Sequence, residues 1–168
     1  RWHRGFVNSA LVGSSFGETP LPELLRALRA SSAAALLQTL LVGLPGDEDE
    51  VDFGPAIEAL QGLEPWSSVV SLHVGGFEYP DEAEISWTEI GPIDGLSKAF
   101  PRLEALHVTG GGIRCARPDW PTLRSLTLET GGLPEGTLEA IASASWPRLS
   151  SLEVWTGAAM YGAGAQAS

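Results

Sequence analysis

The pattern apolar-x-x-apolar-x-apolar occurs six times along the 168 residues of this chain, and its apolar positions are mostly Leu and Val. Successive copies start 30, 32, 34, 20 and 26 residues apart, at Val7, Leu37, Val69, Leu103, Leu123 and Leu149. The first copy is the poorest, because Ala10 stands where the other copies have Leu. Repeats with a period of about 20 to 50 residues predict a stack of similar units, each of which packs on its neighbours.

The last three residues of each copy alternate apolar, variable, apolar, which is the two-residue period of a β-strand. Small or polar residues follow each strand, as Gly13 and Gly43 do, and allow the chain to turn away. The intervals between copies are long enough for a return crossover, so successive strands should be parallel. We therefore expect about six parallel strands in one sheet.

Apolar residues at helical spacing predict helices in four of the crossovers, at 20–35, 55–63, 94–100 and 134–145, with Thr19 as the N-cap of the first. The segment 114–118 contains Pro118 and lies in the shortest interval, so it should be extended or a 3₁₀ turn. The fold class is thus α/β, with helices or irregular segments on the convex face of a solenoid.

An aromatic residue followed by Pro precedes three of the strands, at Phe100-Pro101, Trp120-Pro121 and Trp146-Pro147. Ahead of Val69 the two residue types occur in the opposite order, as Pro65-Trp66. Pro ends a crossover because it lacks the N–H that a helix needs. Rings at equivalent positions of neighbouring units could stack on one another. Since the position recurs with the repeat, we favour this structural role over a binding role for the Trp residues.

The repeated pattern makes the chain resemble leucine-rich-repeat proteins over nearly its whole length. Segments such as Glu84-Ile85-Ser86-Trp87 and Leu152-Glu153-Val154-Trp155 are similar to uncharacterised bacterial members of that group, which are ribonuclease-inhibitor-like. The resemblance implies a curved solenoid that binds other macromolecules, usually proteins. One departure is that the Asn that usually follows the strand is missing from every copy, so the buried Asn ladder should be absent.

Residues 1–157 are expected to form a single solenoid domain, and 158–168 a disordered tail or a truncated next repeat. The Gly- and Ala-rich tail does not resemble the polar cap with which solenoids end. An uncapped last strand would favour self-association through its edge or a partner that covers it.

A formal net charge of −11 argues against nucleic acid and anionic membrane surfaces as partners and favours a basic protein. No apolar run is long enough to span a membrane. Cys115 is the only cysteine, which excludes an intrachain disulfide and favours a reducing compartment, so we expect a cytoplasmic protein.

The residue between the last two apolar positions of each copy should point out of the concave face of the sheet. Across the predicted sheet these residues form one row: Leu11, Leu41, His73, His107, Thr127 and Glu153. The residues that follow each copy form a second row, which includes Thr109, Glu129 and Trp155. We predict that the partner-binding residues are His73, His107, Thr109, Thr127, Glu129, Glu153 and Trp155, with the two His as lateral neighbours and Glu129, Glu153 and Trp155 clustered.

Other kinds of site have less support in the sequence. Two adjacent His could bind zinc, but a third ligand is not evident, and they could instead make binding pH-sensitive. The acidic segments 47–52 and 78–84 lack the ligand order of an EF-hand, so solvated loops are favoured over calcium sites. Cys115 lies near Arg114 and Arg117, which could lower its pKa, although a buried core position is favoured.

No nucleophile elbow or phosphate-binding loop occurs in the sequence. The chain is accordingly expected to be a non-enzymatic protein-interaction module without a cofactor, which binds through the concave face and the acidic edge loops. The alternatives are a structural segment of a larger solenoid with no site of its own, or a small-ligand or metal-dependent enzyme.

Overall fold

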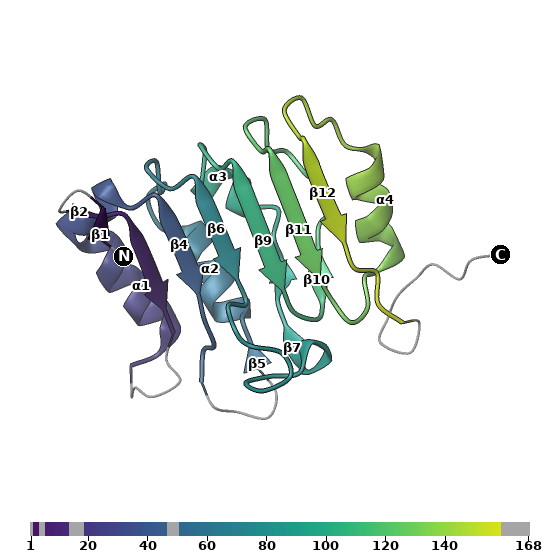
Figure 1. Cartoon of the computed structure of the whole chain (residues 1–168), viewed down its shortest axis with the longest axis horizontal. Coiled ribbons are helices and arrows are strands. Elements are labelled where there is room, and N and C mark those ends of the chain that lie inside the picture. Colours follow the sequence, from purple (N-terminus) through teal and green to yellow (C-terminus); the bar gives the residue numbers. More distant parts are fainter. Residues whose placement is uncertain (1, 4–5, 14–18, 47–50, 159–168) are drawn as a thin grey trace.

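A six-stranded parallel sheet forms the centre of the molecule (Figure 1). The computed structural model describes residues 2–3, 6–13, 19–46 and 51–158. The strands of this main sheet stand in chain order: β3 (Ser9–Val12), β4 (Thr39–Val42), β6 (Ser71–Val74), β9 (Ala105–Thr109), β11 (Ser125–Glu129) and β12 (Ser151–Val154). These are the six strands that the repeated pattern predicts. Before them, β1 (Trp2–His3) and β2 (Phe6–Val7) form an antiparallel pair.

The register of the main sheet also agrees with the sequence pattern. Leu41 pairs with His73, and His73 with His107. The same row continues from His107 to Thr127 and from Thr127 to Glu153. Equivalent positions of the repeat are therefore direct neighbours, because a slip of one residue would move every apolar side chain to the opposite face.

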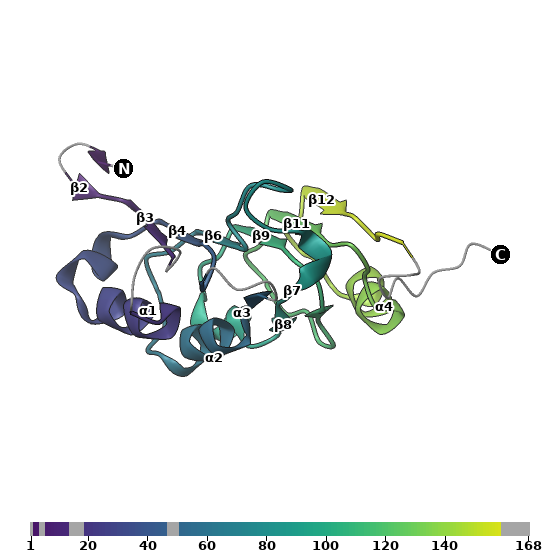
Figure 2. The same cartoon turned by 90° about the horizontal axis from the view of Figure 1, so that it is seen from below.

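Helices cover one face of the main sheet and leave the other face without a helical layer (Figure 2). The four α-helices of the described residues are α1 (Leu21–Ala30), α2 (Gly54–Gly62), α3 (Leu96–Ala99) and α4 (Glu135–Ser143). Each falls within one residue of a predicted helical interval or inside it. At 10 residues α1 is the longest, and no helix in the described part of the chain is long and apolar enough to cross a bilayer.

The first predicted helix, 20–35, is wrong in its extent and in its N-cap. The helix α1 begins after Pro20, which takes the N-cap position expected for Thr19. It ends at Ser31, whose backbone is extended and whose hydroxyl donates to the carbonyl of Leu28 at 2.6 Å. A separate 3₁₀ helix, η1 (Ser32–Leu36), follows. Ser side chains compete with the helical hydrogen bonds in this way, and the apolar spacing does not reveal it.

The core lies between the main sheet and the helices, and the second apolar position of the repeat provides one column of it. Leu40, Leu72, Leu106 and Leu126 in this column are at most 1% exposed. Leu152 occupies the same position on β12 and is 51% exposed. The difference arises because β12 has β11 on one side and no described strand on the other.

The rings that precede the strands stack in pairs at the amino-terminal ends of the strands. Trp66 and Phe100 are parallel within 14° with centroids 6.1 Å apart, and Trp120 and Trp146 are parallel within 4° at 6.2 Å. Trp66, Phe100 and Trp120 are at most 2% exposed, which confirms the structural role expected for these rings. The guanidinium of Arg29 lies 5.7 Å from the Trp66 ring centre.

Two short parallel pairs, which the sequence pattern did not predict, form a further layer at the carboxyl ends of the main strands. The strand β5 (Val51–Asp52) pairs with β7 (Thr88–Glu89), and β8 (Gly91–Pro92) pairs with β10 (Ile113–Arg114). Arg114 begins the segment that was expected to be extended or a 3₁₀ turn, and its extended backbone in β10 agrees with the first of these two possibilities. A 3₁₀ turn, η2 (Ile85–Trp87), leads into β7.

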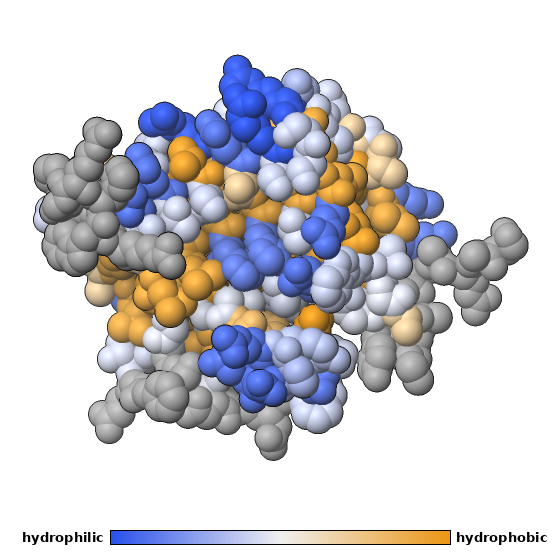
Figure 3. All heavy atoms as spheres, in the orientation of Figure 1, coloured by the Kyte–Doolittle hydropathy of each residue, from blue (hydrophilic) through white to orange (hydrophobic). Residues whose placement is uncertain are grey.

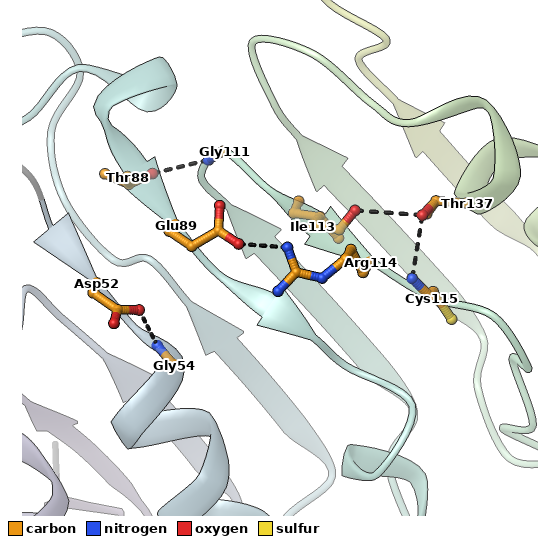
Figure 4. A network of polar contacts seen from close by, with 9 residues as sticks. All are labelled: Asp52, Gly54, Thr88, Glu89, Gly111, Ile113, Arg114, Cys115 and Thr137. Carbon is orange, nitrogen blue, oxygen red and sulfur yellow. Dashed lines mark hydrogen bonds and ion pairs between the residues drawn. The ribbon is translucent and has the colours of Figure 1, made fainter. Parts of the chain in front are cut away.

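Polar contacts hold this layer together (Figure 4). The Thr88 hydroxyl oxygen accepts from the Gly111 N–H at 2.9 Å, and the Arg114 guanidinium contacts the Glu89 carboxylate at 2.6 Å. A side chain on Gly111 would clash with the Thr88 carbonyl oxygen, so this close approach requires glycine. The long connection from Gly75 to Pro92, called the excursion below, is thus fixed to the rest of the protein at its carboxyl end.

The two environments of the leucine column lead to a stability prediction. We expect Leu126→Ala to lower the free energy of unfolding by about 2–5 kcal/mol, because it opens a cavity in a closed part of the core. Leu152→Ala removes the same atoms from a half-exposed site and should cost clearly less. Urea unfolding of both variants measures the difference, and equal losses would contradict the proposed role of the neighbouring strand.

Candidate functional site

The face of the main sheet opposite the helices, called the open face below, carries the residues predicted to bind a partner. His73 on β6 and His107 on β9 lie side by side there. Their rings are parallel within 5° and their centroids are 3.9 Å apart. Adjacent parallel strands bring equivalent side chains this close, which explains why the lateral contact could be predicted.

Thr109 joins the two His to Glu129. Its hydroxyl donates to the Glu129 carboxylate at 3.0 Å, and its oxygen lies 3.3 Å from the Nε2 atoms of both His73 and His107. Since a hydroxyl has one proton, Thr109 is left to accept from the imidazole N–H groups. The Glu129 carboxylate also lies 3.1 Å from His107 Nε2. These four residues form one connected unit, the His–Thr–Glu cluster.

Burial decides the charge state within this cluster. Thr109 is 5% exposed although it points out of the sheet, because its polar neighbours cover it. Burial first, and the nearby His107 second, lower the pKa of His73 to about 4, against a smaller opposite effect of Glu129. His73 is therefore neutral at pH 7, and its imidazole adds no charge to the centre of the open face.

At the carboxyl end of the open face, the residues expected to cluster on β11 and β12 make two separate polar contacts. The Trp155 indole N–H donates to the Glu153 carboxylate at 3.0 Å, so these two residues are joined as expected. Glu129 stands on the neighbouring strand β11, and its carboxylate turns to Thr109 and His107. The pattern placed Glu129 on the strand next to β12 and could not show the direction in which its carboxylate turns.

Apolar side chains at the other end of the open face were in the predicted row but were not predicted as site residues. Leu11 on β3 is 67% exposed, and Leu41 on β4 is partly exposed. The Leu11 side chain lies over Gly43, and the Leu41 side chain lies over Gly76. Their position in the outward row could have identified them as site residues. A Leu that points out of a sheet with no helix above it stays in contact with solvent.

Figure 3 shows the resulting surface, with hydrophilic side chains at the centre of the open face and apolar areas on both sides. Large aromatic side chains on the excursion add to the exposed surface, with Tyr79 at 58% and Trp87 at 63% exposed. Next to Trp87, Ser86 packs closely on Gly131 and places this part of the excursion beside the end of β11.

The described parts of the acidic loops show no arrangement of ligands for a metal ion. In the described ranges, no group of three or more His, Cys, Asp or Glu side chains is placed to hold a metal ion. Glu82 accepts a hydrogen bond from the Glu78 N–H at 2.7 Å, and Asp81 points to solvent. Residues 47–50 of the first acidic segment lie outside the described residues, as do 159–168 of the predicted tail.

Cys115 is a buried core residue and not an activated thiol. It is 2% exposed, and burial together with the adjacent Asp94 carboxylate raises its pKa to about 12. The expected effect of Arg114 is absent because that side chain pairs with Glu89. The alternative of a lowered pKa is therefore wrong, and the thiol remains protonated at pH 7.

The low pKa of His73 leads to a prediction for stability against pH. The unfolded chain binds a proton at His73 near pH 6.5, whereas the folded chain does so only near pH 4. The unfolded state binds more protons between these values, so acidification from pH 6.5 towards pH 4 should destabilise the protein. His73→Gln should remove this contribution, and urea unfolding at several pH values would measure it.

The control for this experiment is Thr127→Ser, which changes the same surface without removing a titratable group. It should keep the wild-type dependence on pH. If the curves of wild type and His73→Gln run parallel from pH 4 to pH 6.5, the buried neutral state of His73 is refuted.

Comparisons with known proteins bear on the fold. No family model matches the sequence, and no curated protein matches it either. A crystal structure of a Bacteroides fragilis protein, determined by the Northeast Structural Genomics Consortium, superposes with a TM-score of 0.82 at 23% identity, over 95% of this chain and 46% of that one. This chain thus spans about half the length of that protein, and at this identity the likeness establishes a shared fold alone.

Proposed function

We propose that the chain is a leucine-rich-repeat solenoid that acts as a non-enzymatic protein-interaction module and binds its partner on the open, concave face. The observation that carries this proposal is the surface of the main sheet. It has no helical layer above it. It presents an exposed Leu and a rigid polar centre in one row across the strands, and an exposed Trp in the adjacent row.

The physical character of this surface suits a partner protein. Side chains on a paired β-sheet are held in place before binding, so little conformational entropy is lost when a partner docks. The stacked His pair and the Thr109 hydrogen bonds add to this rigidity. Trp is also enriched among residues that dominate binding energies, and Trp155 is 47% exposed.

A hydrolase is the weaker alternative because the His–Thr–Glu cluster lacks the geometry of a catalytic triad. In such a triad the His uses one ring nitrogen for the hydroxyl and the other for the carboxylate. Here Nε2 of His107 faces both the Thr109 hydroxyl and the Glu129 carboxylate. In addition, the Thr109 hydroxyl donates to Glu129 and is almost fully buried.

The charge of the chain favours a basic partner. The net charge is −11, and Glu153 on β12 is exposed on the open face. An acidic surface repels nucleic acid phosphates and anionic lipids and attracts basic proteins, most strongly at low ionic strength. The acidic loops at the carboxyl ends of the strands would add to this attraction.

A pair of charge-matched variants tests the proposed face. Thr127→Arg with Glu153→Arg changes the open face by three charges, and Glu139→Arg with Ala142→Arg makes the same change on the exposed side of α4. Affinity capture with quantitative mass spectrometry should yield partners that wild type and the α4 variant share and that the open-face variant loses. Partners lost equally from both variants, or from the α4 variant alone, would refute the open face as the binding surface.

A second candidate function is a structural segment that joins further units at β12. The exposure of Leu152 favours it, as do the backbone groups of Leu152 and Val154, which point away from β11 in a parallel ladder. On this hypothesis the isolated chain self-associates through the strand edge, and Leu152→Glu prevents it. Sedimentation at several concentrations measures this, and a wild-type chain that stays monomeric at every concentration would count against the joining role.

A further inference from the structure

We propose that the open face takes an extended segment of its partner protein that runs across the strands, with an apolar side chain on Leu11 and Leu41 and an Arg or Lys side chain on Glu153 and Trp155. This inference rests on the proposed function and specifies the chemistry of the partner. It follows from the order of side chains along one row of the main sheet.

The apolar end of the row offers a shallow contact area for an aliphatic or aromatic side chain. Leu11 is 67% exposed, and its side chain lies beside Leu41 in the register of the sheet. Each leucine lies over a glycine that follows the next strand, Gly43 after β4 and Gly76 after β6, where no side chain competes for space. A partner side chain that covers this area would remove apolar surface from water, which favours binding.

The opposite end of the row is suited to a cation. The Glu153 carboxylate accepts from the Trp155 indole at 3.0 Å, which holds an exposed aromatic ring next to an exposed negative charge. A guanidinium or ammonium group can bind such a pair through the carboxylate and the ring face together. Glu129 is already committed to Thr109 and His107, so Glu153 is the carboxylate available to the partner at this end.

The centre of the row lies between these two ends and carries no group that would repel the partner's apolar or basic side chain. His73 carries no charge at neutral pH, and the carboxylate of Glu129 faces His107. Thr127 continues the row to Glu153. A crossing chain therefore meets hydrogen-bonding groups and a flat pair of rings here, while the selective contacts lie at the ends.

Strand spacing sets the distance between the two selective contacts. Leu41 on β4 and Glu153 on β12 are four strand steps apart in the same register. At about 4.8 Å a step this is about 19 Å, and an extended chain covers it in about six residues at about 3.3 Å each. The partner segment should thus carry its apolar residue and its basic residue about six positions apart.

Labelled synthetic peptides test this spacing by fluorescence anisotropy. The probes place Leu and Arg six positions apart in a Gly/Ser chain, with comparison peptides at spacings of two and ten and one with Glu in place of Arg. We expect the peptide of spacing six to bind at least tenfold more tightly than any of the others. Glu153→Gln and Leu41→Ser should each weaken it several-fold, whereas Glu139→Gln on α4 should leave it unchanged.

The outcomes separate this inference from the function on which it rests. Equal affinity at all spacings, equal binding of the Glu peptide, or no binding of any peptide would overturn the extended basic segment. The open face would still stand as a binding surface if Thr127→Arg with Glu153→Arg loses protein partners that the α4 variant keeps. If no partner distinguishes those two variants, the proposed function fails, whatever the peptides do.

Discussion

The in-register pairing of parallel strands is the interaction on which the rest of this molecule depends. Each strand brings its Leu and Val residues level with those of the next, so Leu72, Leu106 and Leu126 form one closed column of the core. The same pairing brings the outward residues level. The core and the open face are therefore two consequences of one register, and a shift that spoiled the core would also separate His73 from His107.

The edges of the sheet are stabilised by different means. At the amino-terminal ends of the strands, buried rings stack in pairs, with Trp66 on Phe100 and Trp120 on Trp146. At the carboxyl ends, short parallel strands and contacts such as Arg114 with Glu89 hold the long excursion in place. The exposed Trp87, in the turn that leads into β7, and the exposed Trp155, which follows β12, lie along this second edge.

The properties of the candidate surface depend on tertiary contacts that change the chemistry of ordinary residues. Thr109 would be a surface hydroxyl on an isolated strand, yet here it is covered by its partners and links two imidazoles to a carboxylate. His73 becomes a neutral base because burial outweighs the attraction of Glu129. Cys115 becomes inert for a similar reason, through burial beside Asp94.

The apolar period by itself determined the six strands, their register and the face on which each side chain lies, because a two-residue alternation leaves one way to bury the Leu and Val residues. Apolar residues at helical spacing also located the four helices, although not the end of the first. The apolar period also determined that His73 and His107 are neighbours. Only the tertiary structure decided that Val51–Asp52 and Ile113–Arg114 form strands, and that the carboxylate of Glu129 turns to Thr109 and His107. These outcomes depend on hydrogen bonds and side-chain directions between segments far apart in the chain, on which the local alternation of apolar residues carries no information.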